Sequence, residues 1–533
     1  MEKAMSIGKT SAGGSFHLFV GKTVSTVILA VGTIILGAMI AEADYGLYTI
    51  ALIPSTTFLL FQDWGVGSAV TRRCAQYRAQ GKEAELRRTV VNGLIFELAT
   101  AVALMLLSVL MANILAATVF GKPESASLLV FASINILSIA VFNFTQSVFV
   151  GYEKMKTISL VLICQAVVQS SIAPILVYLG LGTWGALIGY VSATVAGSAI
   201  SIGLLYFVIL KGAKTSGPSV DGVRKAVKSL LNYGVPFALA NILSGGLGQF
   251  YSFMMASYIT DLTLIGNYKV ATNFVALLGF FSVPIVMVLF PAFSKLDPQK
   301  ESQLVKITFA SSVKYGSLLM MPATMIMMVL AGPIIGTLYG DKWPVASTFL
   351  ALSVISNLLA IFGSLSLNGF LLALGETKQV LKMNIVTLAI GVPTAFLLIP
   401  WLGIPGVILG LLAAGVPSLF VGLHFVWKKY GVKIDASSSA RILLASALAA
   451  CAVYSFTYLV AISPLLELIM GTVLFAAVYL VTLPLVGAIR QVDISNLRTM
   501  FSGLFMISKI LEILFGMLEI PLRIASRRGK QGK

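Results

Sequence analysis

Long apolar stretches dominate this chain and fix its class of fold. Fourteen can be marked out, and each is long enough to supply the roughly 20 residues that a helix needs to cross a bilayer. Unpaired backbone groups cannot face lipid, so we expect an all-α integral membrane protein with about fourteen transmembrane helices. The expected spans are 16–40, 46–68, 89–114, 126–150, 157–179, 183–210, 231–258, 264–292, 308–336, 345–373, 380–400, 403–427, 441–462 and 464–488.

The basic residues predict which way the spans run. The chain has 37 Lys and Arg and a net charge of +17, and its loops alternate between basic and nearly base-free. Residues 71–88 are expected to form one of the basic, hydrophilic cytoplasmic loops. With the N-terminus in the cytoplasm, only Lys122 and Lys342 lie outside, and Lys269 lies within a span. Cytoplasmic loops retain basic residues during insertion, so we expect a multi-pass protein of the cytoplasmic (plasma) membrane with both termini inside. The positive charge then reflects topology and does not indicate a nucleic-acid partner.

The two halves of the sequence resemble each other at an offset of about 221 residues. YGLYTIA at 45–51 matches IGNYKVA at 265–271, and LGTWGALIG at 181–189 matches LGIPGVILG at 402–410. The offset covers six spans, an even number, so both copies cross the membrane in the same orientation. We therefore expect two pseudo-symmetric six-helix lobes related by an axis along the membrane normal, with substrate bound between them.

Four regions follow from this repeat. The N-terminal lobe covers 1–215, the C-terminal lobe 216–430, and two extra helices 431–490. The tail, 491–533, mixes apolar and charged positions and ends in a basic stretch. A fifteenth span is one interpretation of residues 494–522. We favour an amphipathic helix in the cytoplasmic interface, where basic residues meet anionic lipid.

Amide side chains inside spans are candidates for lining a substrate cavity. Asn135, Asn143 and Gln146 fall within an arc of about 80° on span 126–150, at 100° per residue. Asn357 and Asn368 are about 20° apart on span 345–373. Each polar group is costly in lipid and should face a cavity or another helix. Substrate contact and hydrogen bonding between helices both remain open for these residues.

Four charged residues within or beside spans are further candidates. Lys22 and Lys269 could anchor an anionic headgroup, or could extend their ammonium groups to the interface. Glu97 and Asp63 could bind a coupling ion or proton, or Glu97 could be paired with a neighbour.

Enzymatic and metal chemistry has little support in the sequence. The chain has two histidines, His17 and His424, which are far apart, and its three cysteines lack metal-ligand spacing. There is no Gly-rich phosphate loop with its lysine. We therefore expect no catalytic residues, no metal and no cofactor. Energy must come from an ion gradient, the membrane potential or the substrate's own gradient.

Motifs in fixed order give the chain a family resemblance. They include QDWGVGSAVTRR at 62–73, FPAFSKL at 290–296, GPIIGTLYGDKW at 332–343 and NGFLLALGETK at 368–378. With the repeated motifs, they resemble polysaccharide and O-antigen flippases of the multidrug/oligosaccharidyl-lipid/polysaccharide exporter superfamily.

This resemblance implies a MATE-like, V-shaped pair of lobes. It also implies that the protein moves a polyprenyl-diphosphate-linked oligosaccharide to the outer leaflet by alternating access. Related flippases line the cavity with cationic residues that face the diphosphate, and Lys22 and Lys269 occupy comparable places. Expected partners are the lipid-linked glycan, membrane lipids and glycan-assembly enzymes, with the protein itself a monomer.

Three other functions compete with this one. A cation-coupled multidrug antiporter of the same superfamily normally has a carboxylate in its cavity, and Glu97 keeps that possibility open. A membrane-embedded glycan polymerase or ligase would need a sizeable outer loop, whereas the longest one expected here is near 121–125. A non-catalytic scaffold is the third competing function, and the internal sequence repeat argues against it.

Overall fold

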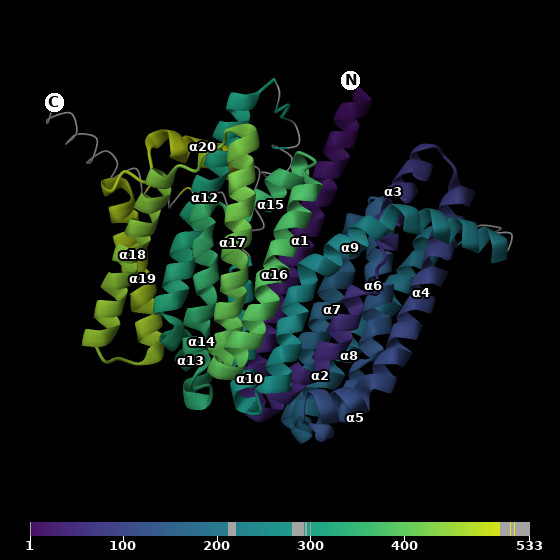
Figure 1. The fold of residues 1–533 in the computed structure, drawn as a ribbon, viewed down its shortest axis with the longest axis horizontal. Coiled ribbons are helices and arrows are strands. Elements are labelled where there is room, and N and C mark those ends of the chain that lie inside the picture. The colour runs from purple at the N-terminus through teal and green to yellow at the C-terminus, as the bar shows by residue number, and fades with distance from the viewer. Residues whose placement is uncertain are drawn as a thin grey trace. The chain divides into compact units, whose positions relative to one another are not determined.

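The computed structural model describes residues 2–211, 220–279, 293, 296–298, 300–501, 512 and 516. The described part is built from helices and contains no strand (Figure 1). The main helices up to residue 277 are α1 (Glu2–Met39), α2 (Glu42–Leu60), α3 (Val66–Ala79), α4 (Glu83–Ile114), α5 (Ala126–Ala132), α6 (Ile134–Gly151), α7 (Met155–Leu176), α8 (Gly182–Leu205), α9 (Val220–Tyr258) and α10 (Leu262–Leu277). The later ones are α12 (Ser302–Val329), α13 (Ala331–Tyr339), α14 (Ala346–Ser353), η6 (Val354–Phe362), α15 (Ser364–Ala373), α16 (Thr377–Leu402), α17 (Ile404–Tyr430), α18 (Ala436–Leu459), α19 (Pro464–Leu485) and α20 (Gln491–Phe501).

The lengths and composition of these helices identify a multi-pass membrane protein. Among the described residues, nine helical segments are long and apolar enough to cross a membrane, or ten if one bent pair counts as a single span. One of the nine, Met155–Ile209, has 55 residues and would measure roughly 80 Å if straight. It reverses at Gly180 and Gly182, whose φ values are 87° and 46°, and its halves α7 and α8 pack together. It therefore contains two of the predicted spans. The prediction of an all-α membrane protein is confirmed.

The predicted span 345–373 is not one straight helix. Its two parts, Ala346–Phe362 and Ser364–Ala373, meet at an angle of 52°. Gly363 between them has a φ of 84°, which favours glycine, and an added Cβ would lie 2.8 Å from Cγ2 of Val313. The predicted alignment of Asn357 with Asn368 assumed a continuous helix and does not hold across this bend.

The predicted hydrophilic loop 71–88 is largely helical. The preceding helix α2 ends at Leu60, and α3 begins at Val66, directly after Gly65 with a φ of 75°. One face of α3 (Val66, Ala69, Val70, Cys74) is buried in a core with residues of α4 and α6. These positions repeat at helical spacing, so α3 packs as an amphipathic helix on its neighbours.

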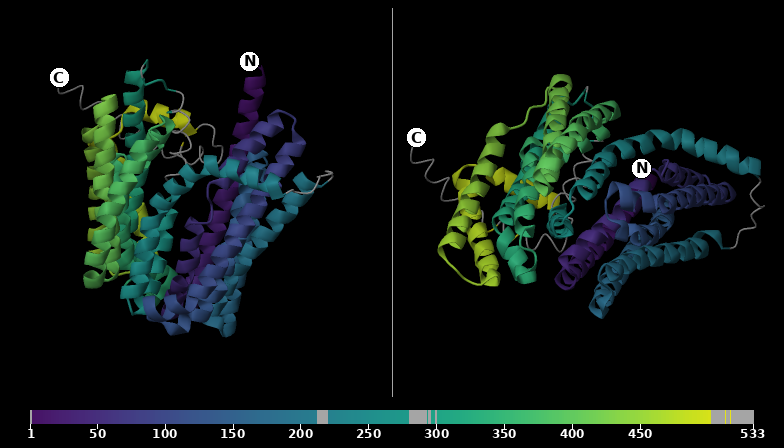
Figure 2. Two further views of the ribbon diagram at one scale, coloured as in Figure 1. Left: turned by 45° about the vertical axis from the view of Figure 1, so that its right-hand side comes forward. Right: turned by 60° about the horizontal axis from the view of Figure 1, so that its bottom comes forward.

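The chain divides into two compact units. The first comprises 1–269 and 395–407, and the second 270–394 and 408–533. In the first unit, α9 is a long helix that Figure 2 shows as a curved ribbon. Gly245, Gly246 and Gly248 lie within this helix, and closely spaced glycines ease bending.

Small residues let α1 and α7 approach closely in the first unit. An added Cβ on Gly21 would lie 2.2 Å from Cβ of Ser159, and one on Gly32 would lie 2.2 Å from Oγ of Ser170. The Ser159 hydroxyl donates to the His17 carbonyl at 2.7 Å, and the Ser170 hydroxyl donates to that of Ile28 at 2.9 Å. Membrane helices associate in this way, through glycine contacts reinforced by hydroxyl groups.

The second unit contains a core around three phenylalanine rings and a helix pair near the C-terminus. The ring of Phe370 packs edge-on against those of Phe293 and Phe309. Helices α18 and α19 lie side by side (Figure 1) and contact α12.

The start of the C-terminal tail is helical, as α20. It is joined to α12 by an ion pair between Lys314 Nζ and Asp493 Oδ2 at 2.6 Å, which is mostly shielded from solvent. Of the expected tail helix, 502–511, 513–515 and 517–533 lie outside the described residues.

Glycines matched by the internal repeat occupy matching local positions. Gly182, the first residue of α8, and Gly403, directly before α17, both have positive φ, at 46° and 63°. Three residues on, a Cβ on Gly185 would lie 2.8 Å from the Leu176 carbonyl carbon, and one on Gly406 would lie 2.2 Å from the Leu398 oxygen. In both places a tight turn brings two helices together at a glycine.

Candidate functional site

A buried carboxylate marks the strongest candidate site, and it lies in the first unit. Glu97, on α4, is only 2% exposed. Its Oε2 accepts a hydrogen bond from Nε2 of Gln62, which is equally buried. Gln62 lies in the break between α2 and α3, where the backbone is not helical. An ionisable group at this depth is costly in lipid and marks a functional position unless it is fully paired.

Asp63 connects this carboxylate to helix α6. Its Oδ1 accepts a hydrogen bond from the Gly67 amide at 3.4 Å, and its charge acts on Glu97. An added Cβ on Gly67 would lie 2.8 Å from Oγ of Ser147, whose hydroxyl donates to the Asn143 carbonyl at 3.0 Å. The structure thus brings together Glu97, Asp63 and the part of α6 that carries Asn143.

The three predicted amides of α6 differ in their surroundings. Asn143 is exposed on the protein surface, and Gln146 is half-buried. Asn135 is completely buried, and its Oδ1 accepts a hydrogen bond from Thr194 of α8 at 2.8 Å. Asn135 therefore forms a hydrogen bond between two helices, which was the alternative to substrate contact for this residue.

The remaining predicted residues lie on other helices. Lys22 is exposed on α1, whereas its neighbours Gly21 and Ser25 are buried against the bundle. Lys269 is half-buried on α10. In the second unit, Asn357 is half-buried in η6 and Asn368 is exposed on α15.

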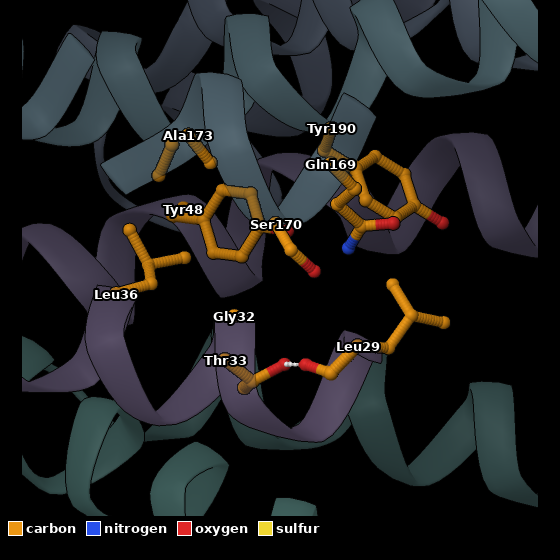
Figure 3. A pocket seen from close by; sticks show the side chains of 10 residues that line it. Leu29, Gly32, Thr33, Leu36, Tyr48, Gln169, Ser170, Ala173 and Tyr190 are labelled. Atoms are coloured by element: carbon orange, nitrogen blue, oxygen red, sulfur yellow. Dashed lines mark hydrogen bonds between the residues drawn. The ribbon is translucent and has the colours of Figure 1, made fainter. Parts of the chain in front are cut away.

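A small pocket lies between α1, α2, α7 and α8 (Figure 3). Its cavity volume is about 10 Å³, room for about one water molecule, and far less than the 300–1,000 Å³ of ordinary small-molecule sites. Polar side chains of Thr33, Tyr48, Gln169, Ser170 and Tyr190 line part of it. In Figure 3, Gln169 and Tyr190 lie beside each other, and the Thr33 hydroxyl donates to the Leu29 carbonyl at 2.6 Å. The pocket is too small for a lipid-linked oligosaccharide.

Lys122 has a structural role that the sequence alone did not indicate. It was expected in an outer loop, yet it is only 5% exposed. Its ammonium donates to the carbonyls of Phe120, Ala256 and Ile259 at 3.2, 3.1 and 3.0 Å. Burial lowers the pKa of Lys122, and the charge of Glu124 partly offsets this effect. The two later carbonyls belong to the C-terminal end of α9, where a cation is favourable. The sequence did contain one signal of this role, because Lys122 is a single lysine on the predicted outer side of the membrane, where the loops carry almost no basic residues.

Two glycines that the repeat aligns contact each other's helices within the first unit. A Cβ on Gly46 would lie 2.0 Å from the Leu262 carbonyl oxygen, and one on Gly266 would lie 2.3 Å from that of Glu42. Beside them, Asn267 Nδ2 donates to Glu42 Oε2 at 2.7 Å. The contact between α2 and α10 is therefore reciprocal.

A second polar contact that the sequence alone did not indicate links α2 to α9. The Oε1 atom of Gln249 accepts hydrogen bonds from the hydroxyl groups of Thr56 and Thr57, each at 3.2 Å.

No group of three His, Cys, Asp or Glu side chains suited to a metal ion occurs in the described ranges. The chemistry of the site is thus that of carboxylates, amides and hydroxyls.

Comparison with known proteins identifies the family. A family model described as "Polysaccharide biosynthesis protein" matches residues 35–348, more than half of the chain. The chain belongs to this family. It is also 23% identical over 280 residues to the probable low-salt glycan biosynthesis flippase Agl15 of Haloferax volcanii. That match spans 51% of this chain and 57% of the Haloferax protein.

Solved structures share the fold of this polysaccharide biosynthesis protein. Lipid II flippase MurJ in an inward closed conformation aligns with a TM-score of 0.69, 16% identity, and coverage of 87% of this chain and 97% of MurJ. An inward-facing multidrug resistance MATE family transporter of the MOP superfamily aligns with a TM-score of 0.61 and 16% identity. It covers 78% of this chain and 98% of the transporter. The fold is therefore of the MurJ and MATE type, and these relatives are flippases and transporters.

Proposed function

We propose that this protein is a flippase that moves a polyprenyl-diphosphate-linked oligosaccharide from the cytoplasmic to the outer leaflet by alternating access. The observation that carries the proposal is membership of the polysaccharide biosynthesis family, together with the likeness to a probable glycan biosynthesis flippase. The physical task fits a membrane-embedded pathway. A diphosphate is prohibitively costly in hydrocarbon, so its passage needs a polar route, while the polyprenyl tail can stay in lipid.

The proposed architecture has fourteen spans with both termini in the cytoplasm. Two six-helix lobes comprise 1–215 and 216–430, followed by two extra helices at 431–490 and an amphipathic tail at 491–533. The reciprocal contact of Gly46 and Gly266 supports this arrangement. Residues near a two-fold axis meet their own equivalents, as in an isologous interface.

The proposed substrate contacts include both cations and amides. Lys22 and Lys269 would face the diphosphate, because ammonium groups form charge-assisted hydrogen bonds with phosphate oxygens. The exposed amides Asn143 and Asn368, with half-buried Gln146 and Asn357, would donate to the sugar or phosphate groups. Asn135 is removed from this set because its buried side chain joins α6 to α8. The protein would act as a monomer beside glycan-assembly enzymes.

A cation-coupled multidrug antiporter is the second candidate. The buried carboxylate of Glu97 and the MATE-type fold favour it. An antiporter should extrude cationic dyes, whereas a flippase should leave dye accumulation unchanged.

Depletion of the protein in its native cells tests the two functions together. For a flippase, lipid-linked oligosaccharide should accumulate in the membrane and remain inaccessible to glycosidase added outside the cells. Unchanged glycan accessibility together with increased retention of a cationic dye would contradict the flippase proposal and support the antiporter.

A further inference from the structure

A buried carboxyl–amide pair joins helix α4 to the break between α2 and α3. Glu97 and Gln62 are each 2% exposed, and they are hydrogen-bonded through Oε2 and Nε2. A neutral glutamine in place of Glu97 would fill the same space and could keep a hydrogen bond to Gln62. Because a buried carboxylate is expensive, its presence here calls for a role in which the charge changes.

The surroundings of Glu97 suit a proton better than a metal cation. One turn earlier on α4, Gly93 contacts Phe144 of α6 and Val70 of α3, so these helices present apolar groups. Within the described ranges, Asp63 is the ionisable side chain whose charge acts on Glu97. One carboxylate and one amide do not make the six to eight oxygen ligands that a Ca²⁺ ion takes.

We propose that Glu97 is the proton-binding residue that couples this transporter to a proton gradient, with Gln62 as its hydrogen-bonding partner. This inference rests on the proposed function and adds its energy source. A proton from the aqueous side binds a carboxylate oxygen of Glu97 and leaves from the same oxygen on the other side. No other bond is made or broken.

Proton binding has a direct structural consequence at the break. An ionised Glu97 only accepts hydrogen bonds, which matches donation from the Gln62 amide nitrogen. A protonated Glu97 also donates, and its new partner can be the Gln62 amide oxygen after the amide rotates. Gln62 is the second residue after the end of α2, and its backbone amide donates to Leu59 at 3.3 Å. The protonation state of Glu97 thus acts on the junction between α2 and α3.

Half-buried Asp63 gives this site a neighbouring charge nearer to water. Two ionised carboxylates close together repel, so protonation of one relieves the other. Asp63 is held by the Gly67 amide at the start of α3. A proton on Glu97 therefore changes the electrostatic environment of both helix ends that meet at the break.

The test uses the full-length protein in sodium-free proteoliposomes that contain labelled polyprenyl-diphosphate oligosaccharide. With one coupled proton, a pH difference of one unit can sustain a leaflet ratio of up to about tenfold. We expect the wild type to approach this ratio and Glu97→Gln to give a ratio near one while still exchanging substrate. Glu83→Gln changes an exposed glutamate at the start of the same helix and should behave like the wild type. Glu97→Asp keeps a carboxyl and should retain coupling.

A second measurement does not depend on transport. Infrared difference spectra recorded across a pH titration should show a buried carboxyl band that Glu97→Gln removes and Glu83→Gln leaves in place. A tenfold ratio maintained by Glu97→Gln, or a ratio driven by sodium and not by protons, would overturn the proposal. Failure of the wild type to move the substrate at all would refute the proposed function, whereas the infrared titration would still decide whether Glu97 binds a proton.

Discussion

The contact between α1 and α7 allows a stability prediction to be worked out from distances. Replacing Gly32 with alanine would place a Cβ 2.2 Å from Oγ and 2.6 Å from Cα of Ser170. Carbon atoms normally approach to about 3.5–4.0 Å, so the helices must separate by about 1 Å at this point. Overpacking of this kind costs about 1–3 kcal/mol. Weakening the bond from Ser170 to the Ile28 carbonyl adds about 0.6 kcal/mol. We therefore expect Gly32→Ala to lower the free energy of unfolding by about 1.5–3.5 kcal/mol.

Reversible unfolding in mixed micelles, followed by circular dichroism, measures this loss. Gly203→Ala is the matched control, because Gly203 is also helical and has nothing within 4 Å of an added Cβ. That control should be neutral or slightly stabilising, since alanine is the better helix former. Ser170→Gly in the Gly32→Ala background should restore part of the loss, as a double-mutant cycle would report. Equal effects of Gly32→Ala and Gly203→Ala would refute the close approach of α1 and α7.

Three further predictions concern charged groups. Lys122→Met removes hydrogen bonds to three carbonyls, so the same unfolding assay should report a loss of about 1–3 kcal/mol. Hydrogen bonds from Lys429 and Tyr430 lower the pKa of Glu376 below its ordinary value of 4.5. The stabilisation that ionised Glu376 provides should therefore be present at neutral pH and be lost as the pH falls from 4.5 through the lowered pKa. The stability difference between wild type and Glu376→Gln, measured from pH 7 to 3, should therefore shrink on acidification and stay under about 1 kcal/mol, because the pair is partly exposed. Lys22→Ala and Lys269→Ala should each slow flipping of the diphosphate-linked substrate; unchanged rates in both would exclude them from the substrate pathway.

The sequence was most informative where one residue pattern determines one structure. Apolar length alone predicted helical membrane spans, because no other secondary structure suits these segments in lipid. The repeat identified Gly182 and Gly403 as equivalent, and both have the positive φ of a turn between helices. These properties depend on local sequence and need no knowledge of packing.

Predictions that depended on contacts between helices were less complete. The 71–88 segment was expected to be a hydrophilic loop, although Val66, Val70 and Cys74 mark a helical face that packs on α4 and α6. Its charged residues obscured that periodicity. At the bend, an added Cβ on Gly363 would lie 2.8 Å from Cγ2 of Val313, a contact that no local pattern reveals.

The candidate site was predictable in its residues but not in its pairings. Glu97 and Asp63 were identifiable because charge is rare within spans, yet Gln62 became part of the site only through a contact 35 positions along the chain. Lys122 was assigned to the outer side by its position, whereas its three carbonyl partners depend on how α9 ends. Sequence therefore identified unusual residues, and the fold was needed to show what they contact.

Movement of a lipid-linked glycan between leaflets tests the central claim most directly. The purified protein would be reconstituted with fluorescent polyprenyl-diphosphate oligosaccharide, and a membrane-impermeant reagent would then quench the label exposed on the vesicle surface. In vesicles with the protein, nearly all of the label should become accessible over time, whereas in protein-free vesicles about half should stay protected. The same protected fraction in both kinds of vesicle would contradict the account.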